Sequence, residues 1–585
     1  MVQQLSWKVG GQQGEGIEST GEIFSTALNR LGYYLYGYRH FSSRIKGGHT
    51  NNKIRVSTTQ VRSVSDDLDI LVAFDQETID VNVHELRVGG VVIADAKFNP
   101  SLPETCTTAT LYAVPFTEIA AELGTSLMKN MVAVGASSAV LHIDTEVFEE
   151  VVLEIFGKKG QKVVQKNMEA IKKGADYIRE QLGEQLETMK LDPADGKKRM
   201  FMIGNDAIAL GALAGGARFM PAYPITPASE IMEYLIKKLP QFGGTVIQTE
   251  DEIAACTMAI GANYAGVRAL TASAGPGLSL MMESIGLAGI TEQPVVIIDT
   301  QRGGPSTGLP TKQEQSDLMA MIYGTHGEIP KIVMAPSTVE EAFYDTIEAF
   351  NLAEECQCPV IMLTDLQLSL GKQSVEPLDY NRVEIRRGKL QQGELEELEE
   401  KQYYKRYRVT EDGVSPRVIP GMKHGIHHVT GVEHDETGKP SESPVNRDDQ
   451  MNKRLRKTKG IRFNTPIHVH SHEKESDILF VGFNSTRGVI EEAMERLEQD
   501  GIKVNHAHIR LIHPFPADEL LPYVQGAKKV VVVENNATGQ LANILKMNIA
   551  SHDKIQSVLK YDGNPFLPQE VYAKSKEMFV LNGNV

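Results

Sequence analysis

A chain of 585 residues is too long for one hydrophobic core, since single cores stop growing at about 250 to 300 residues. Its 41% hydrophobic and 23% charged residues are typical of globular proteins, and no segment approaches the ~20 consecutive apolar residues of a membrane span, so we expect a soluble protein with no membrane partner. The net charge of −16 disfavours general binding to nucleic acid.

The N-terminal segment MVQQLSWKVGGQ lacks the basic and apolar regions of a signal peptide, which together with only four cysteines predicts a cytoplasmic protein. Cys106, Cys256, Cys356 and Cys358 match neither a zinc site nor an iron–sulfur ligand run, so we expect no metal site in this chain. If the protein passes electrons through a cluster, a partner must carry it.

Residues 1–195 alternate short β-branched runs with helical stretches, which predicts an α/β layer domain. Between its first strand and helix lies GGQQGEG (10–16), whose spacing matches neither the dinucleotide fingerprint nor a P-loop. This segment is either a structural tight turn or an anion-binding turn. The next loop places Arg44, Lys46 and His49 around two glycines, as a solvated basic loop or as a clamp for a carboxylate or for carrier phosphates.

Residues 196–385 repeat this alternation with near-continuous apolar strands such as PVVIIDT and PVIMLTD, which predict a parallel sheet covered on both faces. In the turn AYPITP (222–227) two prolines bracket Ile225 and Thr226, and they hold the Thr226 hydroxyl on a rigid turn that suits contact with a reacting group. As a bare turn, this segment would carry no chemistry.

Glu252 begins a helix of small residues, IAACTMAIGANYAG, against which a cofactor could lie. A glutamate in the first turn can simply interact favourably with the helix dipole. In a thiamine enzyme it has another use, because a buried carboxylate hydrogen-bonds the aminopyrimidine ring and promotes the ylid. The strand, glycine turn and helix of TASAGPGLSLMMES (271–284) would shape the pocket wall through Gly275 and Gly277.

Arg302 directly follows the strand PVVIIDTQ, and the carboxyl ends of parallel strands are where α/β sheets present ligands. A guanidinium there can bind a carboxylate through two hydrogen bonds, and Thr311 can return to the same site. Together the stretches between 222 and 311 offer a hydroxyl, a carboxylate and a guanidinium, as a site for a thiazolium cofactor and a 2-oxo acid requires.

Residues 386–465 have little apolar periodicity and form either a functional wrapping segment or a mobile linker. Their histidines (His424, His427, His428 and His434) lack the partners that a metal site needs. Residues 466–585 return to βαβ order, from DILFVGF to KKVVVVE. The predicted fold class is therefore α/β, with several parallel-sheet layer domains.

The motifs AYPITP, EDEIAACTMAIGANYAG, TASAGPG and QRGGPSTGLPT together resemble the α subunit of 2-oxoacid:ferredoxin oxidoreductases. GGQQGEG and SSRIKGGHTNNKIRV resemble the γ domain of that family, fused here ahead of α. The resemblance implies a γ domain at 1–195, a thiamine-diphosphate pyrimidine-binding domain at 196–385, a polar connecting segment at 386–465 and a transketolase C-terminal-like domain at 466–585.

The resemblance also implies roles for single residues. Glu252 would activate the aminopyrimidine, Thr226 would lie near the thiazolium and substrate, and Arg302 with Thr311 would contact the substrate carboxylate. Lys46 would lie near the substrate or coenzyme A. The residues implied to line the cofactor are Tyr223, Pro224, Ile225, Glu252, Gly275 and Gly277.

Thiamine pyrophosphate is normally held through Mg²⁺ and a GDG signature, and no GDG occurs in this chain. The resemblance therefore implies a β subunit that carries the diphosphate site, the Mg²⁺ and a [4Fe-4S] cluster, in a heterotetramer of two α and two β chains. With that partner, the implied reaction is oxidative decarboxylation of 2-oxoglutarate to succinyl-CoA and CO2, with coenzyme A as co-substrate and ferredoxin as acceptor.

The sequence is also compatible with other functions. The same chemistry could act on pyruvate or a branched-chain 2-oxo acid. The chain could instead be a non-catalytic coenzyme-binding assembly subunit. A nicotinamide-linked dehydrogenase that uses GGQQGEG as its dinucleotide loop is disfavoured by the spacing of the glycines.

Overall fold

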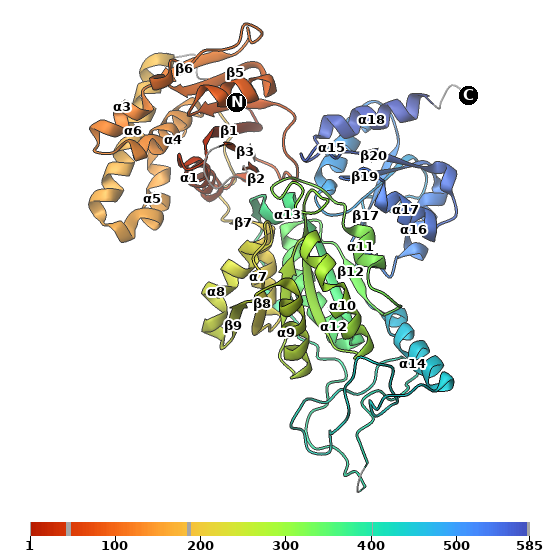
Figure 1. Ribbon diagram of the computed structural model, residues 1–585. Helices are drawn as coiled ribbons and strands as arrows, with labels where there is room; N and C mark the ends of the chain where they lie inside the picture. The colour runs from red at the N-terminus through yellow and green to blue at the C-terminus, as the bar shows by residue number, and fades with distance from the viewer. Residues whose placement is uncertain (1, 42–47, 184–188, 400–401, 582–585) are drawn as a thin grey trace. The chain divides into compact units, whose positions relative to one another are not determined.

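The computed structural model describes residues 2–41, 48–183, 189–399 and 402–581. The chain forms two compact units (Figure 1): one contains 1–202, 370–377 and 567–569, and the other 203–369, 378–566 and 570–585. Among the described residues, no helix combines the length and apolar character needed to cross a membrane.

The first unit is built on an eight-stranded sheet in the order β6-β5-β4-β1-β3-β2-β14-β7. β4, β5 and β6 continue in parallel from β1, whereas β1 pairs with β3, and β3 with β2, in antiparallel fashion. The strands are β1 (Gln4–Gln12), β2 (Tyr34–His40), β3 (His49–Ser57), β4 (Leu68–Ala73), β5 (Leu86–Asp95), β6 (Thr110–Val114), β7 (Met200–Met202) and β14 (Gln373–Val375).

Helices cover both faces of this sheet, and the larger core lies under α1, α4 and α6. Two glycines let α4 and α6 approach closely: a Cβ at Gly135 would lie 1.8 Å from the Ile171 carbonyl oxygen, and one at Gly174 would lie 2.1 Å from that of Val132. The helices are α1 (Ile17–Arg30), α2 (Gln76–Asn82), α3 (Phe116–Glu122), α4 (Lys129–Val140), α5 (Glu149–Phe156) and α6 (Gln161–Leu182).

The second unit contains a five-stranded sheet in the order β10-β11-β13-β12-β18, and a β8-β9 pair that joins β10 through a bridge between Phe219 and Ala269. β10, β11, β13 and β12 are parallel, so their carboxyl ends share one edge. The strands are β8 (Phe219–Ala222), β9 (Thr245–Gln248), β10 (Leu270–Ser273), β11 (Val295–Gln301), β12 (Ile332–Met334), β13 (Pro359–Asp365) and β18 (Leu511–His513).

Apolar side chains alternate between the two faces of this sheet. Ile297 and Ile361 face a core with α9 and α10, and Met362 on the other face meets Thr346 of α12. The helices are α7 (Gly204–Ala214), α8 (Ser229–Lys238), α9 (Glu252–Tyr264), α10 (Gly275–Ile290), α11 (Leu318–Tyr323), α12 (Val339–Cys356) and α13 (Leu366–Leu370).

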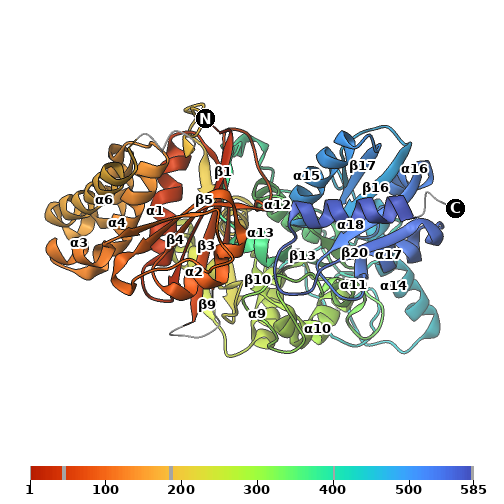
Figure 2. The same ribbon diagram turned by 90° about the horizontal axis from the view of Figure 1, so that it is seen from above.

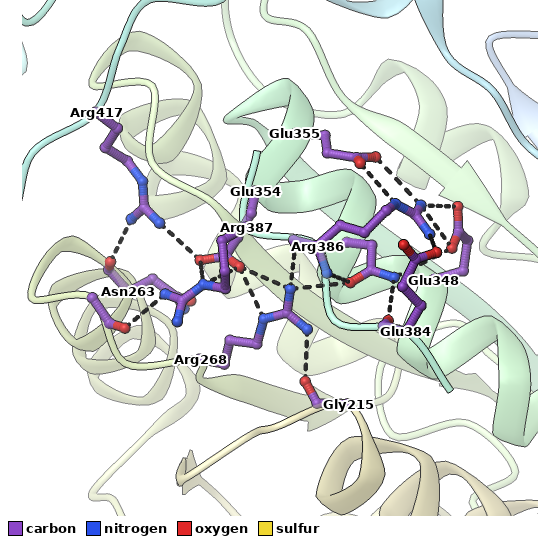
Figure 3. A network of polar contacts seen from close by, with 12 residues as sticks. Gly215, Asn263, Arg268, Glu348, Glu354, Glu355, Glu384, Arg386, Arg387 and Arg417 are labelled. Atoms are coloured by element: carbon purple, nitrogen blue, oxygen red, sulfur yellow. Dashed lines mark hydrogen bonds and ion pairs between the residues drawn. The ribbon is translucent and has the colours of Figure 1, made fainter. Parts of the chain in front are cut away.

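The polar segment 386–465 is fastened to the rest of the second unit by charged groups (Figure 3). Glu354 of α12 accepts three arginines: the distances to its carboxylate are 2.8 Å from Arg268, 2.6 Å from Arg387 and 2.8 Å from Arg417. Because Arg387 and Arg417 belong to this segment, its described part wraps onto the domain rather than forming a free linker.

A second set of ion pairs, here called the Glu292 anchor, is fully buried. Glu292, which follows α10, pairs with Lys453 at 2.6 Å and with Lys457 at 2.5 Å, and all three side chains are fully buried. Lys453 lies on α14 (Pro444–Arg456) and Lys457 directly follows it. Burial of a charge is tolerated only when it is paired, so these contacts fix where α14 docks.

The last sheet of the second unit has the order β15-β17-β16-β19-β20. α15 and α18 cover one face, and α16 and α17 the other (Figure 2). The elements are β15 (Ile467–Val469), β16 (Ser476–Gly482), α15 (Thr486–Gln499), β17 (Val504–Ile509), α16 (Ala517–Gly526), β19 (Ala527–Glu534), α17 (Gln540–Asn548), β20 (Ile555–Leu559) and α18 (Pro568–Leu581).

Parallel-rich sheets between helical layers confirm the predicted α/β fold class. The first sheet is mixed, since antiparallel strands extend its parallel half. The division into four parts at 195, 385 and 465 stays a prediction.

Candidate functional site

The carboxyl ends of β8, β9, β10 and β11 bring together the three stretches singled out in the sequence. The AYPITP turn follows β8, Glu252 begins α9 just after β9, and Arg302 follows β11. The turn and the start of α9 are joined directly, because the Thr249 N–H donates to the Ala222 carbonyl at 3.0 Å. Because these strands are parallel, segments that are far apart in the sequence lie at the same edge of the sheet.

Glu252 is held in place by its neighbours at the start of α9. Asp251 is the N-cap and accepts a hydrogen bond from the Ala254 N–H at 2.7 Å, so the cap role belongs to the preceding residue. The Glu252 side chain is therefore not needed as a cap, and it is only 6% exposed. A buried carboxylate in this position is what contact with an aminopyrimidine ring requires.

Gly277 allows Glu252 to occupy this position. A Cβ at Gly277 would lie 2.7 Å from Glu252 Cγ, 2.8 Å from its Oε1 and 2.0 Å from Ser273 Oγ. Gly275 is similar, since a Cβ there would lie 2.6 Å from a carboxylate oxygen of Asp317. Both glycines are thus required by close approach, not by a left-handed backbone.

Arg302 lies against the AYPITP turn. Its Nη1 donates to the Thr226 carbonyl oxygen at 2.7 Å and its Nη2 to that of Thr307 at 3.4 Å, while its buried Nε has no partner among the described residues. Burial lowers the pKa of Arg302, and Asp317 opposes that shift. The contact sets Arg302 and Thr226 side by side and leaves donors of the guanidinium for another acceptor.

The segment after Arg302 folds back as a closed loop. Gly303 donates to the Lys312 carbonyl at 3.1 Å and accepts from Leu309 at 2.8 Å. Because Lys312 is bonded to Gly303, the preceding residue, Thr311, lies near the start of the loop, and it is buried. The expectation that Thr311 returns toward Arg302 agrees with this geometry, whereas its role stays a prediction.

Two acidic side chains that were not predicted from the sequence, Asp299 and Asp317, lie near this site. Both carboxylate oxygens of Asp299 in β11 and one of Asp317 are buried without a hydrogen-bond partner in the described part of the chain. Burial, and then the neighbouring Asp317, raises the pKa of Asp299 well above its usual value, and burial with Glu314 raises that of Asp317 to about 6. The available signal was an aspartate inside the apolar run VVIIDTQ.

The other predicted residues are placed less centrally or not at all. Tyr223 is 39% exposed, Pro224 is exposed, and Ile225 and Thr226 are half-buried, so the AYPITP turn reaches the surface. Arg44 and Lys46 lie outside the described residues. In GGQQGEG, Glu15 folds back to accept the Gln12 N–H at 3.0 Å and pairs with Lys129, which favours the tight turn.

The donor set fits one half of a thiamine site. Glu252 and the AYPITP turn suit the aminopyrimidine and a small polar substrate, and so does the buried Ser273 hydroxyl, which has no hydrogen-bond partner among the described residues. For the diphosphate, a metal would be needed, and no group of three or more His, Cys, Asp or Glu side chains able to hold one occurs within the described ranges.

Residues 210–453 match the family model described as pyruvate flavodoxin/ferredoxin oxidoreductase, thiamine diphosphate-binding. Residues 6–177 match pyruvate ferredoxin/flavodoxin oxidoreductase, and residues 476–571 match pyruvate:ferredoxin oxidoreductase core domain II.

Relatives match over nearly the whole chain. A 2-oxoacid:ferredoxin oxidoreductase subunit alpha of Sulfolobus sp is 35% identical over 100% of this chain and 99% of its own length. The 2-oxoglutarate oxidoreductase subunit KorA of Mycobacterium tuberculosis is 32% identical over 96% of this chain and 89% of its own. The structure of 2-oxoglutarate:ferredoxin oxidoreductase from Magnetococcus marinus, with 2-oxoglutarate, coenzyme A and succinyl-CoA bound, aligns with a TM-score of 0.92 at 36% identity, covering 99% of this chain and 100% of that one.

Proposed function

We propose that the substrate of this chain, which belongs to the family of 2-oxoacid:ferredoxin oxidoreductase alpha subunits, is 2-oxoglutarate. With a β subunit it would convert 2-oxoglutarate and coenzyme A to succinyl-CoA and CO2, and electrons would pass to ferredoxin. The observation that carries the proposal is the buried Glu252 carboxylate beside a turn that Arg302 holds. Relatives named for 2-oxoglutarate support the choice of substrate.

Thiamine pyrophosphate, when bound, supplies the carbanion chemistry that removes CO2 from a 2-oxo acid. In this proposal Glu252 would hydrogen-bond the aminopyrimidine ring of the cofactor, and Tyr223, Pro224, Ile225, Gly275 and Gly277 would line the cofactor site. Arg302 and Thr311 bind the substrate carboxylate, with Thr226 beside the reacting carbon. Lys46, for which the resemblance implies a place near the substrate or coenzyme A, lies outside the described residues. Binding by a guanidinium fixes the orientation of the keto group before reaction.

The proposal requires a partner. The chain has no GDG signature and no iron–sulfur ligand run, so a β subunit would hold the diphosphate, the Mg²⁺ and the [4Fe-4S] cluster. We expect two copies of each chain in the cytoplasmic enzyme. The partner would complete the site from the side of the exposed AYPITP turn.

The test is to co-express the chain with its β subunit and to assay 2-oxoglutarate, pyruvate and a branched-chain 2-oxo acid with coenzyme A and a ferredoxin-like acceptor. We expect thiamine-dependent turnover, highest kcat/KM for 2-oxoglutarate, and loss of turnover in Glu252→Gln with assembly intact. The matched control is Glu250→Gln, since Glu250 is exposed two residues away. Full activity of Glu252→Gln would contradict the catalytic role of Glu252. A higher kcat/KM for pyruvate than for 2-oxoglutarate would contradict the proposed substrate.

A further inference from the structure

The loop that carries Arg302 and Thr311 is closed by its own backbone bonds, and it is also attached to elements outside it. After Lys312 the chain passes Gln313 and Gln315, whose side chains are 1% and 0% exposed, before it reaches Leu318 of α11. Buried amide side chains must have their hydrogen bonds satisfied. The partners of these two glutamines come from β13, from α13 and from the 466–585 domain, all within the second unit.

Gln315 makes the larger set of these bonds. Its Nε2 donates to Asp365 Oδ2 at 2.8 Å and to the Phe483 carbonyl at 3.1 Å, and its Oε1 accepts the Asn535 N–H at 3.0 Å. Its backbone N–H donates to the Asn535 carbonyl at 2.7 Å, and its own carbonyl accepts from Asn536 Nδ2 at 3.1 Å. Both the side chain and the backbone of Gln315 are thus bonded to elements of the last domain.

Gln313 adds a second attachment, to α13 and to the segment that follows β20. Its N–H donates to the Gly563 carbonyl at 3.1 Å and its Oε1 accepts the Gln367 N–H at 2.8 Å. Asp365, which accepts from Gln315, also accepts the Ser485 hydroxyl at 2.7 Å. The loop therefore joins the end of β13 to the last domain through a continuous chain of hydrogen bonds.

These attachments lie close in the sequence to the groups of the site. The Asp317 N–H, two residues after Gln315, donates to Gln301 Oε1 at 3.1 Å, and Gln301 immediately precedes Arg302. The Asp317 carboxylate in turn lies against Gly275. Both ends of the loop are thereby fixed: one by β11, the other by Gln315.

We propose that Gln315 is a positioning residue that fastens the 302–317 loop to the last domain and so sets the affinity for the 2-oxo acid. The inference rests on the proposed function, because Arg302 and Thr311 are the substrate contacts of that proposal. It assigns a task to the 466–585 domain, which holds the substrate loop through Phe483, Asn535 and Asn536. Gln315 itself touches neither substrate nor cofactor in this arrangement.

The test compares Gln315→Ala with Gln450→Ala in the complex with the β subunit. Gln450 is also fully buried and donates one side-chain bond, to the Tyr407 carbonyl at 3.0 Å, but it lies on α14 outside the site. Kinetics are measured for the 2-oxo acid and for coenzyme A, and amide hydrogen exchange is followed over residues 303–312. Gln315→Met keeps the side-chain volume without the hydrogen bonds and serves as a second variant if the alanine variant does not fold.

In Gln315→Ala or Gln315→Met we expect the KM for the 2-oxo acid to rise about ten-fold or more, since small misplacements of binding groups are expensive, with the KM for coenzyme A within about two-fold. Exchange over 303–312 should accelerate, and Gln450→Ala should change neither measurement. A fall in kcat alone with every KM unchanged, or unaltered exchange over 303–312, would overturn the positioning role. An inactive wild-type complex would overturn the proposed function instead, while the exchange measurement would still decide whether Gln315 holds the loop.

Discussion

Glu354→Gln tests whether buried charges hold the polar segment 386–465 on the rest of the second unit. Glu354 is the shared acceptor of Arg268, Arg387 and Arg417 (Figure 3), and the side chains of Glu354, Arg268 and Arg417 are at most 3% exposed. Burial lowers the pKa of Arg417 to about 10 and also lowers that of Arg268, while Glu354 opposes both shifts. Without the carboxylate charge, two buried guanidinium groups lose their counter-ion.

Breaking a buried ion pair by removing one partner destabilises a protein by about 3 to 5 kcal/mol. Arg387 is 30% exposed and adds at most about 1 kcal/mol. We therefore expect Glu354→Gln to lower the free energy of unfolding of the second unit by about 3 to 5 kcal/mol. The part of the segment around α14 should stay attached, because Lys453 and Lys457 pair with Glu292 and not with Glu354.

The assay combines thermal unfolding, followed by circular dichroism, with amide hydrogen exchange over residues 386–399 and 402–420. The matched control is Glu355→Gln, which removes the neighbouring carboxylate from Arg386, a half-exposed arginine that keeps Glu348. That change should lower stability by about 0 to 1 kcal/mol. Equal small effects of both variants, with unchanged exchange, would refute the reasoning that this segment depends on buried charge pairing.

Further predictions concern the site and the pH dependence. Gly277→Ala should reduce thiamine-dependent turnover strongly, because its Cβ would meet Ser273 Oγ and Glu252 and displace them; normal turnover and thiamine affinity would contradict the close-approach argument. Burial holds the pKa values of His506 and His508 well below their usual value, so the unfolded chain binds more protons below pH ~6.5 and stability falls there by about 1.4 kcal/mol per pH unit per ring. His506→Gln should reduce that slope in urea unfolding between pH 7 and 5.5, and an unchanged slope would count against it.

Much of the site could be predicted from the sequence, because its residues follow strands. Apolar runs identified the strands, parallel order placed their carboxyl ends together, and Thr226, Glu252 and Arg302 each stand just after such an end. The direct bond between Arg302 and the Thr226 carbonyl agrees with that expectation. The family was also predicted correctly, since several motifs in one order carry more information than any one glycine turn.

Other features could not be found in this way. Gln315 lies in a loop without apolar periodicity, and its partner Asn535 is 220 residues away. The sequence does not decide whether 386–465 wraps onto the protein or is a mobile linker, because its acceptors Glu354, on α12, and Glu292, just after α10, lie much earlier in the chain. The sequence predicted a pocket wall at Gly275 and Gly277, but the side chains that require each glycine, Asp317 at Gly275 and Ser273 with Glu252 at Gly277, are brought close only by the packing.

The sequence by itself determined the α/β class, the family and the residue types around the 222–311 cluster, because these depend on periodicity and on short motifs along the chain. Only the tertiary structure decided how those groups are held: Asp251 rather than Glu252 caps α9, Thr226 presents its carbonyl to Arg302, and Gln315 ties the loop to the last domain. Hydrogen bonds and burial depend on partners that are distant in sequence, and no local pattern records which partner will be met.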